Sequence, residues 1–112
     1  MLGLTVRWSL AEAPAGVEAE LERYVAESSH QRFTGMDGLR FKTWRMVPGA
    51  WFEGCYVFES AEARAAFQEG FTATAAESPG SRIIGSPPVL VEPCQVVAVA
   101  EGAAGFRASP SS

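Results

Sequence analysis

The sequence predicts a single α+β domain in which the elements follow one another as β-α-β-β-α-β. Three observations lead to this prediction: an alternation of apolar and polar residues near the N-terminus, two segments with apolar residues at helical spacing, and an aromatic-rich hairpin between those segments. This order is the split βαβ, or ferredoxin-like, arrangement. Its four-stranded antiparallel sheet carries both helices on one face and leaves the other face bare.

The first strand and the first helix are justified by periodicity. Apolar residues take every second position from Leu2 to Leu10, which is typical of a strand with one buried face. Residues 12–31 then show apolar residues at helical spacing, and Pro14 is well placed for a first helical turn. Residues 32–38 contain glycines and break this pattern, so we expect a loop there.

The hairpin and the second helix come next. Gly38–Met46 and Trp51–Phe58 are predicted as the two arms, and residues 47–50 as the turn between them. Ser60 is a good N-cap for the helix that follows. That helix carries a stripe of small and aromatic residues, and we expect this stripe to pack on the sheet.

The C-terminal part is less regular. Residues 77–93 are broken by prolines and glycines and contain two short apolar runs, at 82–84 and 89–91. Residues 94–101 are predicted as the final strand, apolar on both sides. The domain is therefore expected to span residues 1–101, and residues 102–112 have the composition of a flexible tail.

The bare face of the predicted sheet needs a cover, because its strands offer large apolar groups on both sides. A second copy of the same sheet is the simplest cover, since two identical sheets can close into a barrel around a two-fold axis. The sequence therefore predicts a homodimer.

Bulk composition excludes several classes of partner. The formal net charge is −4, so a nucleic acid is not an expected partner. No apolar run approaches the roughly 20 residues that a membrane span needs. The N-terminus lacks the pattern of a secretion signal, so a cytoplasmic location is expected. Cys55 and Cys94 are expected as buried, reduced thiols. One histidine in the chain excludes a site built from several histidines, so no metal is expected.

Three short features are shared with a known family: Lys42-x-Trp44, Gly54-x-Tyr56-x-Phe58 and the aromatic residue Phe67. On these features the chain resembles the YdhR-type monooxygenases of the dimeric α/β-barrel superfamily, from about residue 4 to residue 101. The resemblance implies a homodimer with a ligand pocket in each subunit. Superfamily relatives include oxygenases that act on polycyclic phenols without metal or flavin, haem-degrading enzymes, and isomerases or dehydratases, and the fold alone does not choose among them.

The candidate catalytic residues are His30, Glu53 and Tyr56. His30 is the only side chain whose ordinary pKa suits proton transfer near neutrality, but it also suits the end of the first helix, where a cation complements the dipole. Glu53 is a reserve base if burial raises its pKa, and Tyr56 is either a proton donor or an ordinary buried tyrosine.

The candidate substrate-binding residues are Arg40, Lys42, Trp44, Phe67 and Phe71. The two cations either anchor an anionic oxygen of the ligand, or lie at a solvated edge, or form an ion pair with Glu53 across the hairpin. The three aromatic residues either line a pocket or belong to the core or the dimer interface.

Two classes of function remain open. The first is a cofactor-independent monooxygenase that acts on a hydrophobic aromatic or polyketide-like molecule in an apolar pocket. The second is a non-redox enzyme, such as a cyclase or isomerase, or a ligand-binding dimer without turnover. No G-x-G-x-x-G follows a strand, so a dinucleotide site is not supported.

Overall fold

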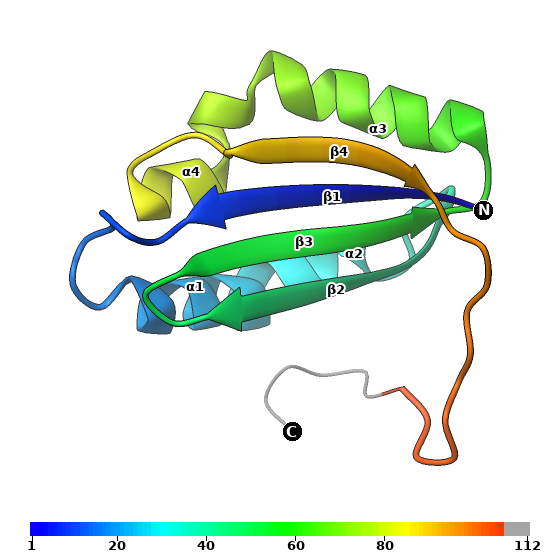
Figure 1. The fold of residues 1–112 in the computed structure, drawn as a ribbon, viewed down its shortest axis with the longest axis horizontal. Coiled ribbons are helices and arrows are strands. Elements are labelled where there is room, and N and C mark those ends of the chain that lie inside the picture. The colour runs from blue at the N-terminus through cyan, green and yellow to red at the C-terminus, as the bar shows by residue number, and fades with distance from the viewer. Residues whose placement is uncertain (107–112) are drawn as a thin grey trace.

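The computed structural model describes residues 1–106 of the chain, and it has the predicted α+β, ferredoxin-like fold (Figure 1). The elements are β1 (Leu2–Ser9), α1 (Val17–Tyr24), η1 (Val25–Ser29), α2 (His30–Phe33), β2 (Leu39–Val47), β3 (Trp51–Phe58), α3 (Ala61–Ala73), η2 (Ala75–Glu77), α4 (Pro79–Ile84) and β4 (Leu90–Gln95). Of these, η1 is a π-helical stretch and η2 is a single 3-10 turn.

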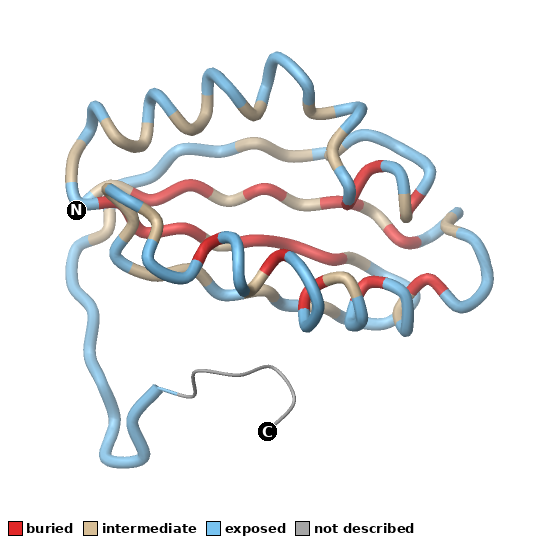
Figure 2. Tube along the Cα trace, turned by 180° about the vertical axis from the view of Figure 1, so that it is seen from behind, coloured by how far each residue is buried: buried red, intermediate tan, exposed pale blue. Residues whose placement is uncertain are grey.

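The four strands form one sheet in the order β2-β3-β1-β4, and each neighbouring pair is antiparallel. Figure 1 shows α1 and α2 behind β2 and β3, and α3 along the side of β4. The core lies on this helix-covered face. Figure 2, seen from behind, shows buried residues concentrated in the two central strands and on the inner side of α1. We call the opposite side of the sheet the bare face.

Strand register decides which side chains reach the core. Leu4 pairs with Tyr56, and Tyr56 pairs with Lys42 on the other side, so these three residues share the helix-covered face. Glu53 pairs with Arg7 in β1 and with Arg45 in β2. Because successive side chains of a strand point to opposite faces, and Glu53 is an odd number of residues from Tyr56, Glu53 lies on the bare face. The period of two in β1 is confirmed, because its alternate residues from Leu4 onward are buried.

Local signals at the hairpin and at α3 are confirmed. The predicted turn lies between β2 and β3, where Gly49 has a positive φ of 75° that favours glycine. Ser60 caps α3, because its hydroxyl accepts a 3.1 Å hydrogen bond from the backbone N–H of Ala63. These two features hold the hairpin and the following helix in place.

The predicted loop at 32–38 begins too early. The helical segment continues through η1 and α2 to Phe33, and the chain turns only after that residue. Phe33 is buried, and its ring contacts the rings of Trp44, Tyr56 and Phe67. Burial of this ring stabilises the extra helical turn. The loop was predicted from the glycines of the segment, and these do not reveal that Phe33 is buried.

The prediction of a final strand at 94–101 was wrong. The edge strand β4 is Leu90–Gln95, and it pairs with β1 from Arg7 back to Leu2. Pro93 is tolerated there because β4 is an edge strand. Residues 96–101 pass beyond the end of β1 and contain no strand, and the apolar run at 82–84 belongs to α4. Of the predicted tail, residues 107–112 lie outside the described residues.

Candidate functional site

A cavity of about 440 Å³ lies on the helix-covered face, between the helices that follow β1 and those that follow β3. We call it the inner cavity. Its lining residues come from α1, η1 and α2 on one side, from α3, η2 and α4 on the other, and from β2 and β3 beneath: Tyr24, Ser29, Arg32, Phe33, Lys42, Trp44, Tyr56, Ala66, Phe67, Gly70, Phe71, Thr74, Glu77, Ser78, Pro79 and Gly80.

Aromatic rings form the walls of the inner cavity. The ring centroids of Tyr56 and Phe67 are 4.8 Å apart, and those of Phe33 and Tyr56 are 5.6 Å apart. Phe67 stacks on Phe71 along α3 with a centroid separation of 6.2 Å. The five predicted residues Lys42, Trp44, Tyr56, Phe67 and Phe71 are thus brought together, and Phe33 joins them. Such walls suit a planar, largely apolar ligand.

Lys42 places its terminal amine among these rings. Its Nζ is 3.6 Å from the ring centroid of Phe33, 4.4 Å from that of Tyr56 and 4.5 Å from that of Trp44. Burial of the amine, and secondarily the nearby Arg32 guanidinium, lower the pKa of Lys42 to about 6. The amine is therefore an acceptor or donor of a proton near neutral pH.

Gly54 allows Lys42 and Tyr56 to fold over the sheet. A Cβ atom at this position would lie 3.0 Å from Cε of Lys42 and 3.3 Å from the hydroxyl oxygen of Tyr56. The strand shows no bulge at Gly54, since the only register shift of the hairpin lies between Leu39 and Phe41. A close approach of side chains, rather than a bulge, accounts for this glycine.

Trp44 forms a hydrogen bond with the π-helical stretch η1. Its indole N–H donates a 3.0 Å hydrogen bond to the hydroxyl of Ser29, which is buried. The polar group of Trp44 is therefore already satisfied within the protein. π-Helical turns of this kind are frequent at functional sites.

Tyr56 can donate a hydrogen bond, but its hydroxyl is a weak acid. It is buried at 5% exposure, and this burial raises the pKa of its hydroxyl. The phenol therefore stays protonated at neutral pH and can donate a hydrogen bond to a ligand oxygen.

His30 belongs to a second hollow. This edge groove, of about 810 Å³, runs between α1 and the free edge of β2, and its lining includes His30, Lys42 and Trp44. The ring of His30 lies 5.8 Å from that of Trp44, and His30 does not line the inner cavity. We take the inner cavity as the candidate site, because its walls are aromatic and enclosed by helices on two sides.

Glu53 is remote from the inner cavity, contrary to the expectation that it serves there as a reserve base. It lies on the bare face, where it accepts hydrogen bonds from Nε of Arg7 at 2.9 Å and from Nε of Arg45 at 2.7 Å. Burial alone would raise the pKa of Glu53, but these two guanidinium groups outweigh it and the pKa is lowered. Glu53 is therefore ionised and forms ion pairs with Arg7 and Arg45. The guanidinium of Arg7 also lies 4.3 Å from the ring centroid of Trp51.

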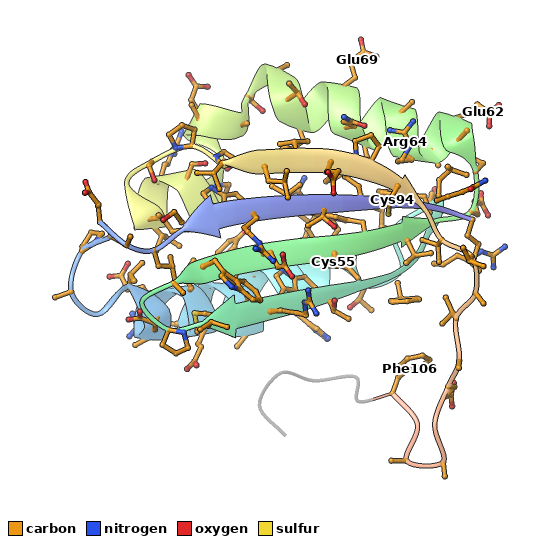
Figure 3. All side chains as sticks on the ribbon, viewed as in Figure 1. Cys55, Glu62, Arg64, Glu69, Cys94 and Phe106 are labelled. Carbon is orange, nitrogen blue, oxygen red and sulfur yellow. The ribbon has the colours of Figure 1, made fainter. Side chains whose placement is uncertain are left out.

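Arg40 is also outside the cavity. It lies at the register shift between Leu39 and Phe41 and is exposed, so the structure does not place it beside Lys42. Figure 3 shows Cys55 and Cys94 on the strands of the sheet. Both thiols are free, and register places both on the bare face, beside Thr5 and Gly3 respectively. The expected burial of both was wrong, because Cys55 is only partly buried and Cys94 is exposed on the edge strand.

Sequence reasoning missed the contribution of the first helical segment to the site. Tyr24, Ser29, Arg32 and Phe33 all line the inner cavity. One signal was available in the sequence. Four residues lie four positions apart and so share one helical face: Leu21, Val25, Ser29 and Phe33. This spacing predicts a helix that extends into the segment 32–38, which we expected to be a loop.

Known proteins share the fold. A structure of the NE2512 protein of unknown function from Nitrosomonas europaea has 24% sequence identity and a TM-score of 0.65, and the match covers 91% of this chain and 94% of that one. A structure of a mutant of MhuD with two manganese protoporphyrin IX bound per active site has 23% identity and a TM-score of 0.54, covering 90% of this chain and 98% of that one. No protein-family model and no curated protein matches the chain. At this identity the likeness establishes the fold.

Residues 1–106 contain no group of three or more His, Cys, Asp or Glu side chains placed to hold a metal ion. None of the helices in that range is long and apolar enough to cross a membrane.

Proposed function

We propose that the protein is a YdhR-type, cofactor-independent monooxygenase that acts on a hydrophobic aromatic or polyketide-like molecule in the inner cavity. One observation carries the proposal: an aromatic cavity of about 440 Å³ into which one amine and one phenol converge, from Lys42 and Tyr56. An apolar pocket with few convergent polar groups is the usual form of a site for such a molecule.

The residues suggest how the reaction would begin. A phenol or other acidic substrate loses a proton, and the resulting anion is electron-rich enough to react with O₂. Lys42 and Tyr56 would lie beside the anionic oxygen, as a cation and a hydrogen-bond donor. Such groups act strongly where water is excluded. Phe33, Phe67 and Phe71 would hold the rings of the substrate in place.

The MhuD structure raises the question of a porphyrin, because two manganese porphyrins are bound per active site of that protein. Haem iron is commonly held by His, Cys or Met, and in some proteins by Tyr. The described residues that line the inner cavity include no His, Cys or Met. The cavity has two tyrosines, Tyr24 and Tyr56, and burial raises the pKa of the Tyr56 hydroxyl, which stays protonated. This donor set lacks the commonest ligands of haem iron, so we propose a ligand without a metal.

A homodimer is part of the proposal. The bare face carries partly buried or exposed apolar groups, including Phe41, Trp51 and Leu90, around the ion pairs of Glu53. A second copy of the sheet would remove this surface from water, as the resemblance implies. We further propose a cytoplasmic location.

Oxygen consumption tests the proposed activity. Purified protein, treated with a chelator, is mixed with a panel of anthrones and hydroquinones, and oxygen uptake is followed with an electrode. We expect uptake with at least one compound and its loss in Tyr56→Phe and Phe67→Ala variants. If no compound supports uptake above the rate without protein, the monooxygenase proposal fails.

A ligand-binding dimer without turnover, or a non-redox enzyme, is the second candidate, and a specific observation favours it. Of the three acid–base candidates, His30 and Glu53 lie outside the inner cavity, which leaves few groups for catalysis. Mass spectrometry of the protein purified from its native host would identify a retained small molecule. A retained molecule that remains unchanged during prolonged incubation in air supports this candidate.

A further inference from the structure

Lys42 has surroundings unlike those of the other basic residues within residues 1–106. It is the single lysine in the sequence. Its amine faces three aromatic rings, at 3.6 to 4.5 Å from their centroids. Within residues 1–106 no hydrogen bond or ion pair to a carboxylate involves Lys42, and the ion pairs that are present there join Glu53 to Arg7 and Arg45. A lysine in an apolar pocket without a carboxylate is costly to keep charged.

The surrounding groups decide the charge of this amine. The titratable or charged side chains that share a hollow with Lys42 or act on its pKa are Glu22, Arg23 and Tyr24 of α1, His30 and Arg32 of α2, Arg45 of β2, Cys55 and Tyr56 of β3, and Glu77 of η2. Burial, and secondarily Arg32, oppose a positive charge on the amine, whereas the nearby Cys55 favours one. The balance lowers the pKa of Lys42 to about 6, so the amine is largely uncharged at neutral pH.

We propose that Lys42 acts as an uncharged amine that takes up a proton when an aromatic weak acid occupies the inner cavity. With a phenol or an enol, the O–H bond of the ligand breaks and an N–H bond of Lys42 forms, so that the proton stays within the complex. With an aromatic carboxylate, which is already ionised in water, the proton comes from the solvent. In both cases the bound state is an ammonium beside an anion.

The class of ligand follows from the cavity. Its rings accept a planar aromatic molecule, and the hydroxyl of Tyr56 can donate a second hydrogen bond to the same oxygen. Arg32, exposed at the lining of the cavity, adds a positive potential that favours an anion. A neutral aromatic molecule would gain the stacking but would leave the amine unpaired. We therefore expect selection for weak acids over their uncharged analogues.

This inference rests on the proposed function only in placing an aromatic ligand in the inner cavity, and it does not require oxygenation. The proposed monooxygenase activity and the proposed proton uptake by Lys42 can therefore be disproved independently. An absence of oxygen uptake would leave the proton acceptor intact, whereas an ordinary, always charged Lys42 would leave an oxygenase possible through other groups.

The single lysine makes a direct test feasible. The protein is labelled with lysine carrying ¹³C at Cε, so that one NMR signal reports on Lys42, and the pH is titrated with and without saturating 2-naphthoate. We expect a midpoint near 6 in the free protein and an upward shift of roughly two units or more in the complex. A midpoint near the ordinary value of about 10.4 in the free protein overturns the inference, as does a midpoint that 2-naphthoate leaves unchanged.

Calorimetry supplies an independent readout on the same ligand. Binding of 2-naphthoate is measured near pH ~7.5 in buffers of different ionisation enthalpy, and the dependence of the heat on the buffer gives the proton uptake. We expect about one proton per ligand for the wild type, and none for uncharged 2-naphthamide. The Lys42→Arg variant, which stays charged, should bind 2-naphthoate without proton uptake, and Lys42→Met should bind it about tenfold more weakly or worse. Uptake of a proton by the Lys42→Met variant, or no binding of 2-naphthoate to the wild type, overturns the inference.

Discussion

The indole N–H of Trp44 donates a 3.0 Å hydrogen bond to the hydroxyl of Ser29, and this bond joins the edge strand β2 to the π-helical stretch η1. Ser29 is 2% exposed, so its oxygen has no ready replacement from water. The bond holds η1, which lines one side of the inner cavity, in place relative to β2, which lies beneath the cavity. It also explains why η1 and α2 stay close to the sheet.

The Ser29→Ala variant should therefore be less stable. It leaves the indole N–H of Trp44 without its partner, which costs about 1–3 kcal/mol in the free energy of unfolding when the group is buried. Urea denaturation followed by far-UV circular dichroism measures this change. The neighbouring Ser28 is exposed, so Ser28→Ala is the matched control and should change the free energy of unfolding by less than about 0.5 kcal/mol. Equal losses in the two variants would show that the hydrogen bond contributes nothing specific.

Gly54→Ala tests the packing of Lys42 over the sheet. The added methyl group would meet Cε of Lys42 at 3.0 Å, and the flexible end of the lysine can move away from it. We expect a change of less than about 1 kcal/mol in the free energy of unfolding, because the strain is offset by the strand preference of alanine over glycine. The amine, however, should leave its place among the rings, so the NMR midpoint of Lys42 should rise toward the ordinary lysine value.

The control for this variant is Gly102→Ala, because nothing lies within 4 Å of a Cβ atom at that position. It should leave both the stability and the midpoint of Lys42 unchanged. A Gly54→Ala protein whose Lys42 midpoint equals that of the wild type would contradict the role assigned to this glycine.

The sequence predicted the fold and most of the floor of the cavity, because both follow from periodicity. Alternation placed Lys42 and Trp44 on one side of their strand, and register then joined Tyr56 to them. Register itself is set by the turn and by which face is buried, and neither is visible in a single strand. For that reason alternation put Glu53 and Tyr56 on opposite faces of β3, but the sequence could not decide which of the two shares a face with Lys42.

The remaining misses have a common physical cause, namely tertiary contacts that override local signals. Phe33 lies in helix because its ring is buried against Tyr56 and Phe67, although glycine follows at position 35. β4 begins at Leu90 because residues 2–7 of β1 supply its partners, and not because residues 94–101 lack strand propensity. Such pairings depend on residues far apart in the chain, so a local pattern does not reveal them.

The bare-face ion pairs make stability depend on pH. The folded-state pKa of Glu53 lies below its ordinary value, so the contribution of Glu53 to stability is complete above about pH 5 and is lost as the pH falls through the folded-state pKa. At pH 7, Glu53→Gln should lower the free energy of unfolding by about 1–3 kcal/mol, because two guanidinium groups that bond to a carboxylate would then face an uncharged amide. The difference between the two proteins should shrink progressively in urea titrations carried out at lower pH.

Glu69→Gln is the control for this prediction, because Glu69 is exposed on α3, as Figure 3 shows. Its substitution should change the free energy of unfolding little at any pH. If the difference between the wild type and Glu53→Gln is the same at low and at neutral pH, the ion pairs with Arg7 and Arg45 are not its source.

A charge placed on the bare face should prevent the proposed pairing of two sheets. Thr43 is exposed there on β2, opposite Cys55, and Thr43→Glu would bring an uncompensated carboxylate into an interface around a two-fold axis. Burial of such a charge is costly unless it is paired, so we expect the wild type to have the mass of a dimer and the variant that of a monomer, by light scattering at micromolar concentration. Thr72→Glu, on an exposed position of α3, is the matched control and should remain a dimer. A wild type that is monomeric under these conditions would remove the homodimer from the proposed function, whereas a variant that remains dimeric would place the interface elsewhere on the molecule.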